Sequence, residues 1–101
     1  MNGRIPLIAG NWKMHKTVAE SVDTAVSLKE LIEGTQGVEV MLAPVFTAIT
    51  ALVEALEGSS IAVGAQNLFW EKQGAYTGEV SPEMLREAGC SQVIVGHSER
   101  R

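Results

Sequence analysis

Short apolar runs alternate along this chain with longer segments in which apolar residues recur at helical spacing. The runs lie at residues 5–10, 38–43, 61–65 and 92–96. Each is too short for a helix and is followed by residues that break regular structure or are polar. The first run is continuous rather than alternating, which is typical of a strand covered on both faces. The pattern therefore predicts four strands.

A first helix is predicted from Thr17 to Gly34. Thr17 and Glu20 have the spacing of a capping box, in which each side chain binds the other residue's backbone N–H. Glycine is the usual residue just beyond a helix end, so Gly34 marks the stop. The residues at helical spacing between them are Val18, Val22, Ala25, Val26 and Ile32.

Two further helices follow the second and third strands. Apolar spacing predicts one from Phe46 to Gly58. The other begins with Ser81 as N-cap and Pro82 at the first helical position, and it ends at Gly89. Its expected inward-facing residues are Met84, Leu85 and Ala88.

Strands that are joined by helices lie parallel, because each helix returns the chain to the same end of the sheet. The fold class is therefore α/β, and no linker divides the 101 residues into smaller domains. The residues that follow each strand gather at one edge of the sheet. We expect Asn11, Lys13 and His97 to become neighbours there.

The connection from Gln66 to Val80 is longer than is usual in a compact domain. It carries Leu68, Phe69, Trp70 and Tyr76. Apolar rings on a long loop favour docking against another surface. A loop folded back on its own domain is the alternative.

Composition narrows the function classes. The net charge of −4 gives no basic face for nucleic acid, although local cations could still bind an anionic metabolite.

Cys90 is the only cysteine, so we expect no internal disulfide and a reducing compartment. We expect Cys90 to have a packing role rather than to act as a nucleophile. The apolar stretch at residues 5–10 is too short for a signal sequence or a membrane span, so a cytoplasmic location is expected.

Three polar residues at strand ends are candidates for chemistry. The Lys13 ammonium could stabilise a phosphate or a developing oxyanion, and the Asn11 amide could donate to the same oxygens. His97 could exchange protons near neutral pH. Each also has an ordinary interpretation: a surface lysine, a turn asparagine and a structural histidine. The sequence contains neither a metal-ligand cluster nor a glycine-rich phosphate loop.

Four motifs together resemble the triosephosphate isomerase family, in the family's order along the chain. They are Ala9–Met14, Gln66–Asn67, Gly74–Glu79 and Val95–Arg101. The resemblance implies the N-terminal half of a (β/α)8 TIM barrel, with residues 1–101 forming a single partial barrel domain of four parallel strands with connecting helices. It also implies the glycolytic and gluconeogenic interconversion of dihydroxyacetone phosphate and glyceraldehyde 3-phosphate through an enediolate. No cofactor or metal is implied.

The same resemblance assigns roles to residues of this chain. Asn11 and Lys13 bind the substrate, and Lys13 also offsets the charge of the enediolate. His97 is the neutral catalytic electrophile, a role for which this family is itself the reference case.

Three supporting residues complete the implied site. Glu99 pairs with Lys13, and Ser98 begins the helix that follows the fourth strand. Thr77 reaches into the neighbouring subunit of a homodimer to support Asn11 and His97 there.

The resemblance extends over the first four of the family's eight strand–helix units. The family's catalytic glutamate, its lid and its glycine-rich phosphate-binding turns belong to the later units, so we expect these 101 residues to be inactive alone. The alternative is a self-associating half-barrel without isomerase activity. Homo-oligomers are expected through the loop 66–80 or through pairing of half-barrels, and neither nucleic acid nor membrane is an expected partner.

Overall fold

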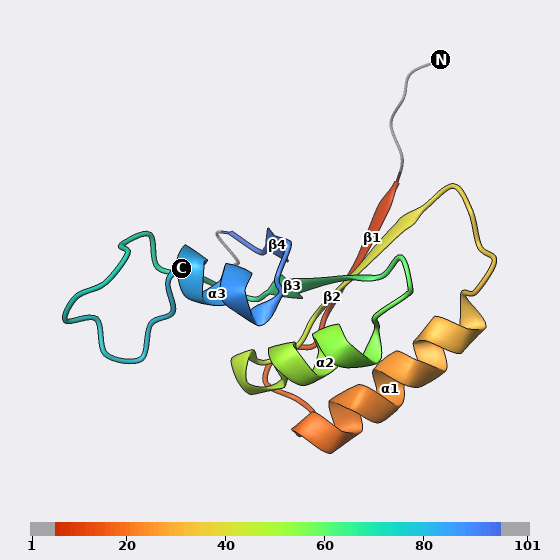
Figure 1. Cartoon of the computed structure of the whole chain (residues 1–101), viewed down its shortest axis with the longest axis horizontal. Coiled ribbons are helices and arrows are strands. Elements are labelled where there is room, and N and C mark those ends of the chain that lie inside the picture. The colour runs from red at the N-terminus through yellow and green to blue at the C-terminus, as the bar shows by residue number, and fades with distance from the viewer. Residues whose placement is uncertain (1–5, 96–101) are drawn as a thin grey trace, which may run out of the picture.

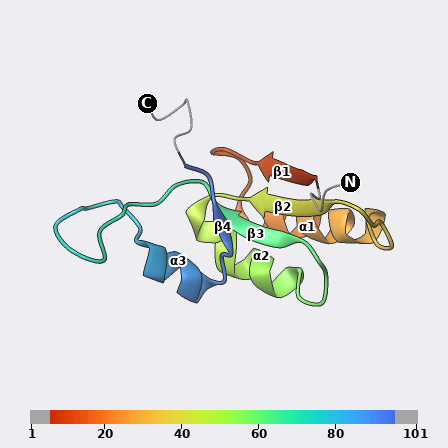
Figure 2. The same ribbon diagram turned by 90° about the horizontal axis from the view of Figure 1, so that it is seen from above.

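Four parallel strands form one sheet in the computed structural model, which describes residues 6–95. The strands lie in the order β1 (Leu7–Asn11), β2 (Glu39–Ala43), β3 (Ala62–Ala65) and β4 (Gln92–Val93). The helical segments are α1 (Val18–Leu31), the 3₁₀ turn η1 (Phe46–Ala48), α2 (Ile49–Ala55) and α3 (Pro82–Ala88). Figures 1 and 2 show the helices together on one face of the sheet.

The register of the strands confirms the predicted α/β fold with helical crossovers. Asn11 lies opposite Ala43, and Gly64 lies opposite Gln92. The ladder continues beyond β4, because the Ile94 N–H donates to Ala65 O at 2.8 Å. All four strands therefore deliver their carboxyl ends to one edge of the sheet.

The predicted start signals are confirmed for α1 and α3, whereas α1 ends at Leu31, three residues before the predicted stop at Gly34. Thr17 N–H donates to Glu20 Oε1 at 2.9 Å, and Glu20 N–H donates to Thr17 Oγ1 at 3.3 Å, which completes the capping box. Ser81 Oγ accepts from Met84 N–H at 3.3 Å, and Gly89 ends α3 with a left-handed φ of 106°. A φ in this range strains residues other than glycine.

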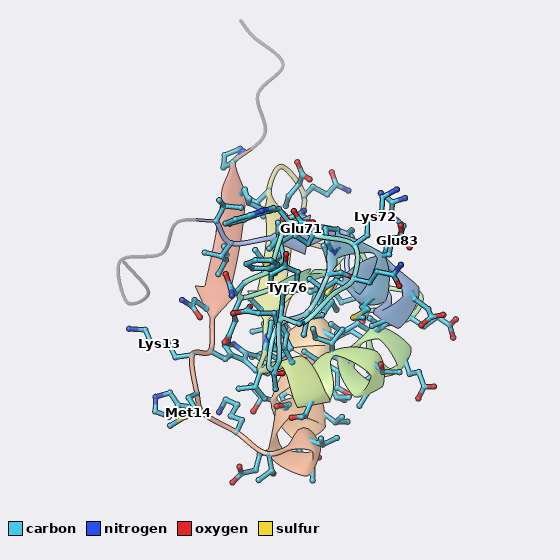
Figure 3. All side chains as sticks on the ribbon, turned by 90° about the vertical axis from the view of Figure 1, so that its left-hand side faces the viewer. Lys13, Met14, Glu71, Lys72, Tyr76 and Glu83 are labelled. Atoms are coloured by element: carbon cyan, nitrogen blue, oxygen red, sulfur yellow. The ribbon has the colours of Figure 1, made fainter. Side chains whose placement is uncertain are left out.

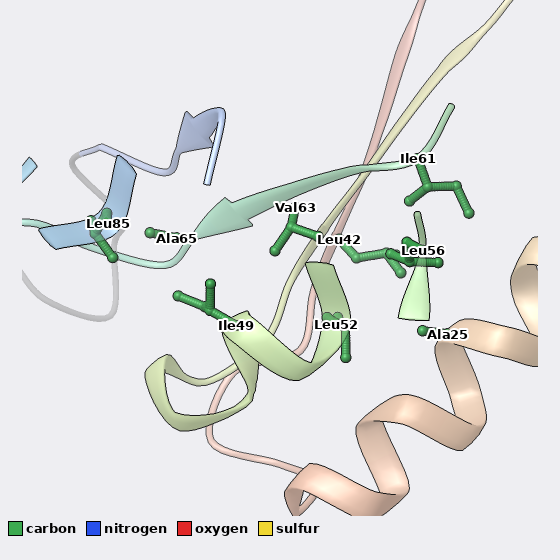
Figure 4. Close-up of a cluster of buried hydrophobic side chains, with 9 residues drawn as sticks. All are labelled: Ala25, Leu42, Ile49, Leu52, Leu56, Ile61, Val63, Ala65 and Leu85. Atoms are coloured by element: carbon green, nitrogen blue, oxygen red, sulfur yellow. The ribbon is translucent and has the colours of Figure 1, made fainter. Parts of the chain in front are cut away.

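The hydrophobic core lies between the helices and the covered face of the sheet (Figure 4). Ile49 and Leu52 of α2 are fully buried at its centre. Burying a side chain of this size contributes about 1.5–3 kcal/mol to folding. The buried cluster consists of Ala25, Leu42, Ile49, Leu52, Leu56, Ile61, Val63, Ala65 and Leu85.

The prediction that the first strand is covered on both faces is wrong for the described residues. Leu7 is 51% exposed and Ile8 is 57% exposed. Leu7 points to the face opposite that of Ile8, because neighbouring residues of a strand alternate between faces. The main contacts of α1 are with η1 and α2. Ile8 therefore lines an open apolar groove with Trp12 and Leu28.

Two details of the predicted helices also need correction. Met84 does not face inward but is 54% exposed, and the buried residues of α3 and its cap are Leu85 and Ser81, each 5% exposed. The second helix does not begin as an α-helix at Phe46, since residues 46–48 form a 3₁₀ turn. Its N-cap, Val45, provides no side-chain hydrogen bond.

No helix among residues 6–95 is long and apolar enough to cross a membrane.

The capping box makes the stability of α1 depend on pH. Hydrogen bonds from the Thr17 backbone and side chain lower the pKa of Glu20 from its ordinary value of 4.5. A carboxyl whose pKa falls on folding stabilises the folded state above the ordinary pKa, and this contribution is lost as the pH falls through the lowered value. Glu20→Gln should therefore lower the unfolding temperature at pH 6–7, and the difference from wild type should shrink towards pH 3. Thermal unfolding followed by circular dichroism measures both.

Asp23→Asn is the matched control on the same helix, since Asp23 is exposed and lies outside the cap. A pH-dependent difference for Asp23→Asn as large as that for Glu20→Gln would contradict this account.

Candidate active site

Asn11 and Lys13 are joined by a tight turn at the carboxyl end of β1. The Lys13 N–H donates to Asn11 Oδ1 at 2.9 Å. Lys13 has a φ of 55°, in the left-handed region that costs a non-glycine residue about 1–3 kcal/mol. The Oδ1 atom of Asn11 accepts in this turn, and the Nδ2 group of the same amide is a donor of the kind that binds anionic oxygen. The turn therefore fixes the Asn11 amide and the backbone from which the Lys13 side chain extends.

Gln66, immediately after β3, connects this turn to the rest of the sheet edge. Its Nε2 donates to Lys13 O at 2.8 Å and to Ala43 O at 2.9 Å. Trp12 N–H also donates to Ala43 O, at 3.1 Å. The ends of β1, β2 and β3 are therefore tied together by hydrogen bonds. The sequence motif contained Gln66 but gave it no role; its position directly after a strand was the available signal.

The segment after Asn11 carries two exposed cations, Lys13 and Lys16. Figure 3 shows Lys13 and Met14 beyond the end of β1, with their side chains directed away from the sheet. The Lys16 ammonium lies 5.7 Å from the centre of the Trp12 ring. This is a cation–π contact, so Lys16 interacts with the ring of Trp12. His15 is also exposed.

Three of the predicted site residues, His97, Ser98 and Glu99, lie outside the described residues. The strand that leads to them ends at the same edge as β1, because β3 and β4 are parallel. Three strand spacings separate β1 from β4, roughly 14 Å in a flat sheet. The prediction that His97 shares a site with Asn11 and Lys13 remains a prediction.

Thr77 is exposed on the loop 66–80, which projects away from the sheet beyond α3 (Figures 1 and 2). The base of the loop is closed by Phe69 N–H donating to Val80 O at 2.8 Å. The ring centroid of Phe69 lies 4.6 Å from the ring centroid of Trp70 and 4.4 Å from that of Tyr76. The rings pack on one another, and Trp70 remains 75% exposed. The chain thus does not bring Thr77 to its own Asn11.

Cys90 packs against the core, half-buried, behind α3. Burial raises the pKa of the Cys90 thiol, so the neutral thiol is favoured over the reactive thiolate. Among residues 6–95, no group of three or more histidine, cysteine or acidic residues could hold a metal ion.

Two of the cavities in the described part of the chain lie beside α1. One, of about 420 Å³, lies between the C-terminal parts of α1 and α2, where Lys29 Nζ donates to Glu57 O at 3.1 Å. The other is the apolar groove beside β1, of about 370 Å³. Neither is lined by Asn11 or Lys13, so both are separate from the candidate site.

Residues 6–101 match the family model of triosephosphate isomerase. The triosephosphate isomerase of Pelobacter propionicus is 62% identical over 98 residues, covering 97% of this chain and 39% of its own length. That of Moorella thermoacetica is 60% identical over the same shares of both chains. The crystal structure of triosephosphate isomerase from Bartonella henselae superposes with a TM-score of 0.84 at 39% identity, covering 97% of this chain and 40% of that one.

This chain thus spans about two fifths of the length of its relatives. The four-stranded parallel sheet agrees with the first half of the barrel that the motifs implied. The family match, the relatives and the fold agree: the chain belongs to the triosephosphate isomerase family.

Proposed function

We propose that the protein containing this chain interconverts dihydroxyacetone phosphate and glyceraldehyde 3-phosphate. The Asn11–Lys13 turn supports this assignment most directly. Its Oδ1–N hydrogen bond of 2.9 Å and the hydrogen bond from Gln66 hold the Asn11 side chain and the Lys13 backbone at the carboxyl edge of a parallel sheet. Active sites of barrel enzymes are built at this edge.

Each site residue has a distinct proposed task. The Lys13 ammonium stabilises the negative charge of the phosphate and of the enediolate oxygen, and Asn11 Nδ2 donates to substrate oxygen. His97 polarises the carbonyl and transfers a proton between the two oxygens as the double bond moves. Glu99 holds the Lys13 ammonium in place, and Ser98 caps the helix behind His97. This chemistry requires neither a metal nor a cofactor.

A half-barrel that only self-associates is the second candidate. It is favoured by the open side of β1, where Leu7 and Ile8 are each more than half exposed. It predicts association without turnover. The single cysteine of the chain fits a cytoplasmic location for either candidate.

A chimaera tests the isomerase directly. In it, this chain replaces the segment that it matches in the Pelobacter propionicus relative. The chimaera should convert triose phosphate. Lys13→Met should lower kcat/KM by roughly 10²–10³-fold, because it removes a charge that stabilises the transition state. A coupled assay in both directions measures this loss.

Lys16→Met is the matched control, since Lys16 is an exposed lysine three residues further on and lies against Trp12. It should change kcat/KM less than twofold. The proposed function would be refuted if the chimaera without further substitutions were inactive. It would also be refuted if Lys13→Met and Lys16→Met lowered kcat/KM equally.

The exposed rings of the loop 66–80 support a homodimer in which this loop docks on a second copy. Trp70 is 75% exposed although it stacks on Phe69. Buried tryptophans contribute strongly at interfaces, so Trp70→Ala in the chimaera should raise the dimer dissociation constant roughly thirtyfold, equivalent to about 2 kcal/mol. Analytical ultracentrifugation measures the constant.

Leu31→Ala is the control, because Leu31 is 79% exposed at the end of α1 and outside the loop. It should leave the dissociation constant unchanged. A dimer that persists unaltered in Trp70→Ala would exclude docking through the loop and favour pairing through β1.

A further inference from the structure

The side-chain amide of Gln66 links segments that are distant in the sequence. Its Nε2 group has two N–H donors, and the two acceptors are Lys13 O, 53 residues away, and Ala43 O, 23 residues away. The distances of 2.8 and 2.9 Å are those of well-formed hydrogen bonds. A single side chain thus fixes the end of β3 to the ends of β1 and β2.

The acceptor on the β1 side belongs to a residue with an unusual backbone. Lys13 has a left-handed φ of 55° although it carries a side chain. Its N–H is held by Asn11 Oδ1 at 2.9 Å, and its C=O is held by Gln66 Nε2. The two peptide groups that flank the Lys13 Cα are therefore each anchored by a side-chain amide. The direction of the Cα–Cβ bond follows from these two peptide planes.

We propose that Gln66 is a positioning residue for Lys13. It holds the strained backbone of Lys13, and so the direction in which the side chain that carries the ammonium leaves the end of β1, before the substrate arrives. This role rests on the proposed isomerase function, and it assigns a task to a residue that makes no contact with the reacting atoms. Preorganisation of this kind matters because a misplacement of about 1 Å can cost roughly 10²-fold in rate.

The chemistry of the two acceptors explains why glutamine suits this position. Both are backbone carbonyl oxygens, so the side chain must supply two donors. Ionised glutamate would place a carboxylate against them, and methionine has nearly the same length without a donor. Gln66→Met therefore removes the hydrogen bonds while it changes the shape little.

The test uses the active chimaera that carries this chain. Gln66→Met should lower kcat/KM for glyceraldehyde 3-phosphate by roughly 10–100-fold through displacement of the ammonium. Gln73→Met, an exposed glutamine of the loop, is the matched control and should change it less than twofold. A change of less than twofold for Gln66→Met would overturn the proposal.

A double-mutant cycle with Lys13→Met separates positioning from general stability. If Gln66 acts through the Lys13 ammonium, adding Gln66→Met to Lys13→Met should lower kcat/KM no further, while the losses in melting temperature still add. A full additional loss of kcat/KM in the Lys13→Met background would show that Gln66 acts otherwise and would overturn the proposal.

A second readout requires no turnover, so it keeps this proposal distinct from the proposed function. A residue with a left-handed φ gives a strong nuclear Overhauser effect between its own amide and α protons. This signal at Lys13 should weaken in Gln66→Met and persist in Gln73→Met. An unchanged signal in Gln66→Met would contradict the positioning role, even if the unsubstituted chimaera were inactive.

Discussion

Parallel pairing of the four strands is the constraint on which the rest of this structure depends. Each helix returns the chain to the start of the next strand, so every strand ends at the same edge. Asn11, Ala43 and Gln66 come together only for this reason, since they are far apart in the sequence. The hydrogen bonds of Gln66 then hold these ends in a single arrangement.

The two faces of the sheet differ in how they are stabilised. Leu42 and Val63 lie in register on the helical face and are buried by α2 and its neighbours. Met41 points to the other face, where its side chain lies over Gly64 and is 4% exposed. A Cβ at Gly64 would approach Met41 Sδ to 2.6 Å, so the absence of a side chain there is what admits the methionine.

Much of the fold follows from local sequence signals. Thr17 with Glu20 and Ser81 with Pro82 locate the helix starts because capping depends on neighbouring residues alone. The exposure of Leu7, Ile8 and Met84 did not follow, since burial depends on which elements pack on one another and periodicity does not specify that. The 3₁₀ turn at residues 46–48 is likewise invisible to apolar spacing.

The candidate site was predictable in part. The position of Asn11 and Lys13 at a strand end could be inferred from the apolar run before them. The hydrogen bond from Gln66 to Lys13 could not, because it joins residues that are 53 positions apart, and apolar spacing gave no sign of the left-handed φ of Lys13. The roles of His97, Glu99, Ser98 and Thr77 rest on the family motifs and remain predictions.

The most direct measurement is a crystal structure of the chimaera with triose phosphate bound. The account predicts one substrate molecule at the carboxyl edge, with Lys13 Nζ, Asn11 Nδ2 and a ring nitrogen of His97 each within hydrogen-bond distance of it, about 2.7–3.2 Å. A substrate molecule bound elsewhere, or one that His97 cannot reach from the edge that carries Asn11 and Lys13, would contradict it.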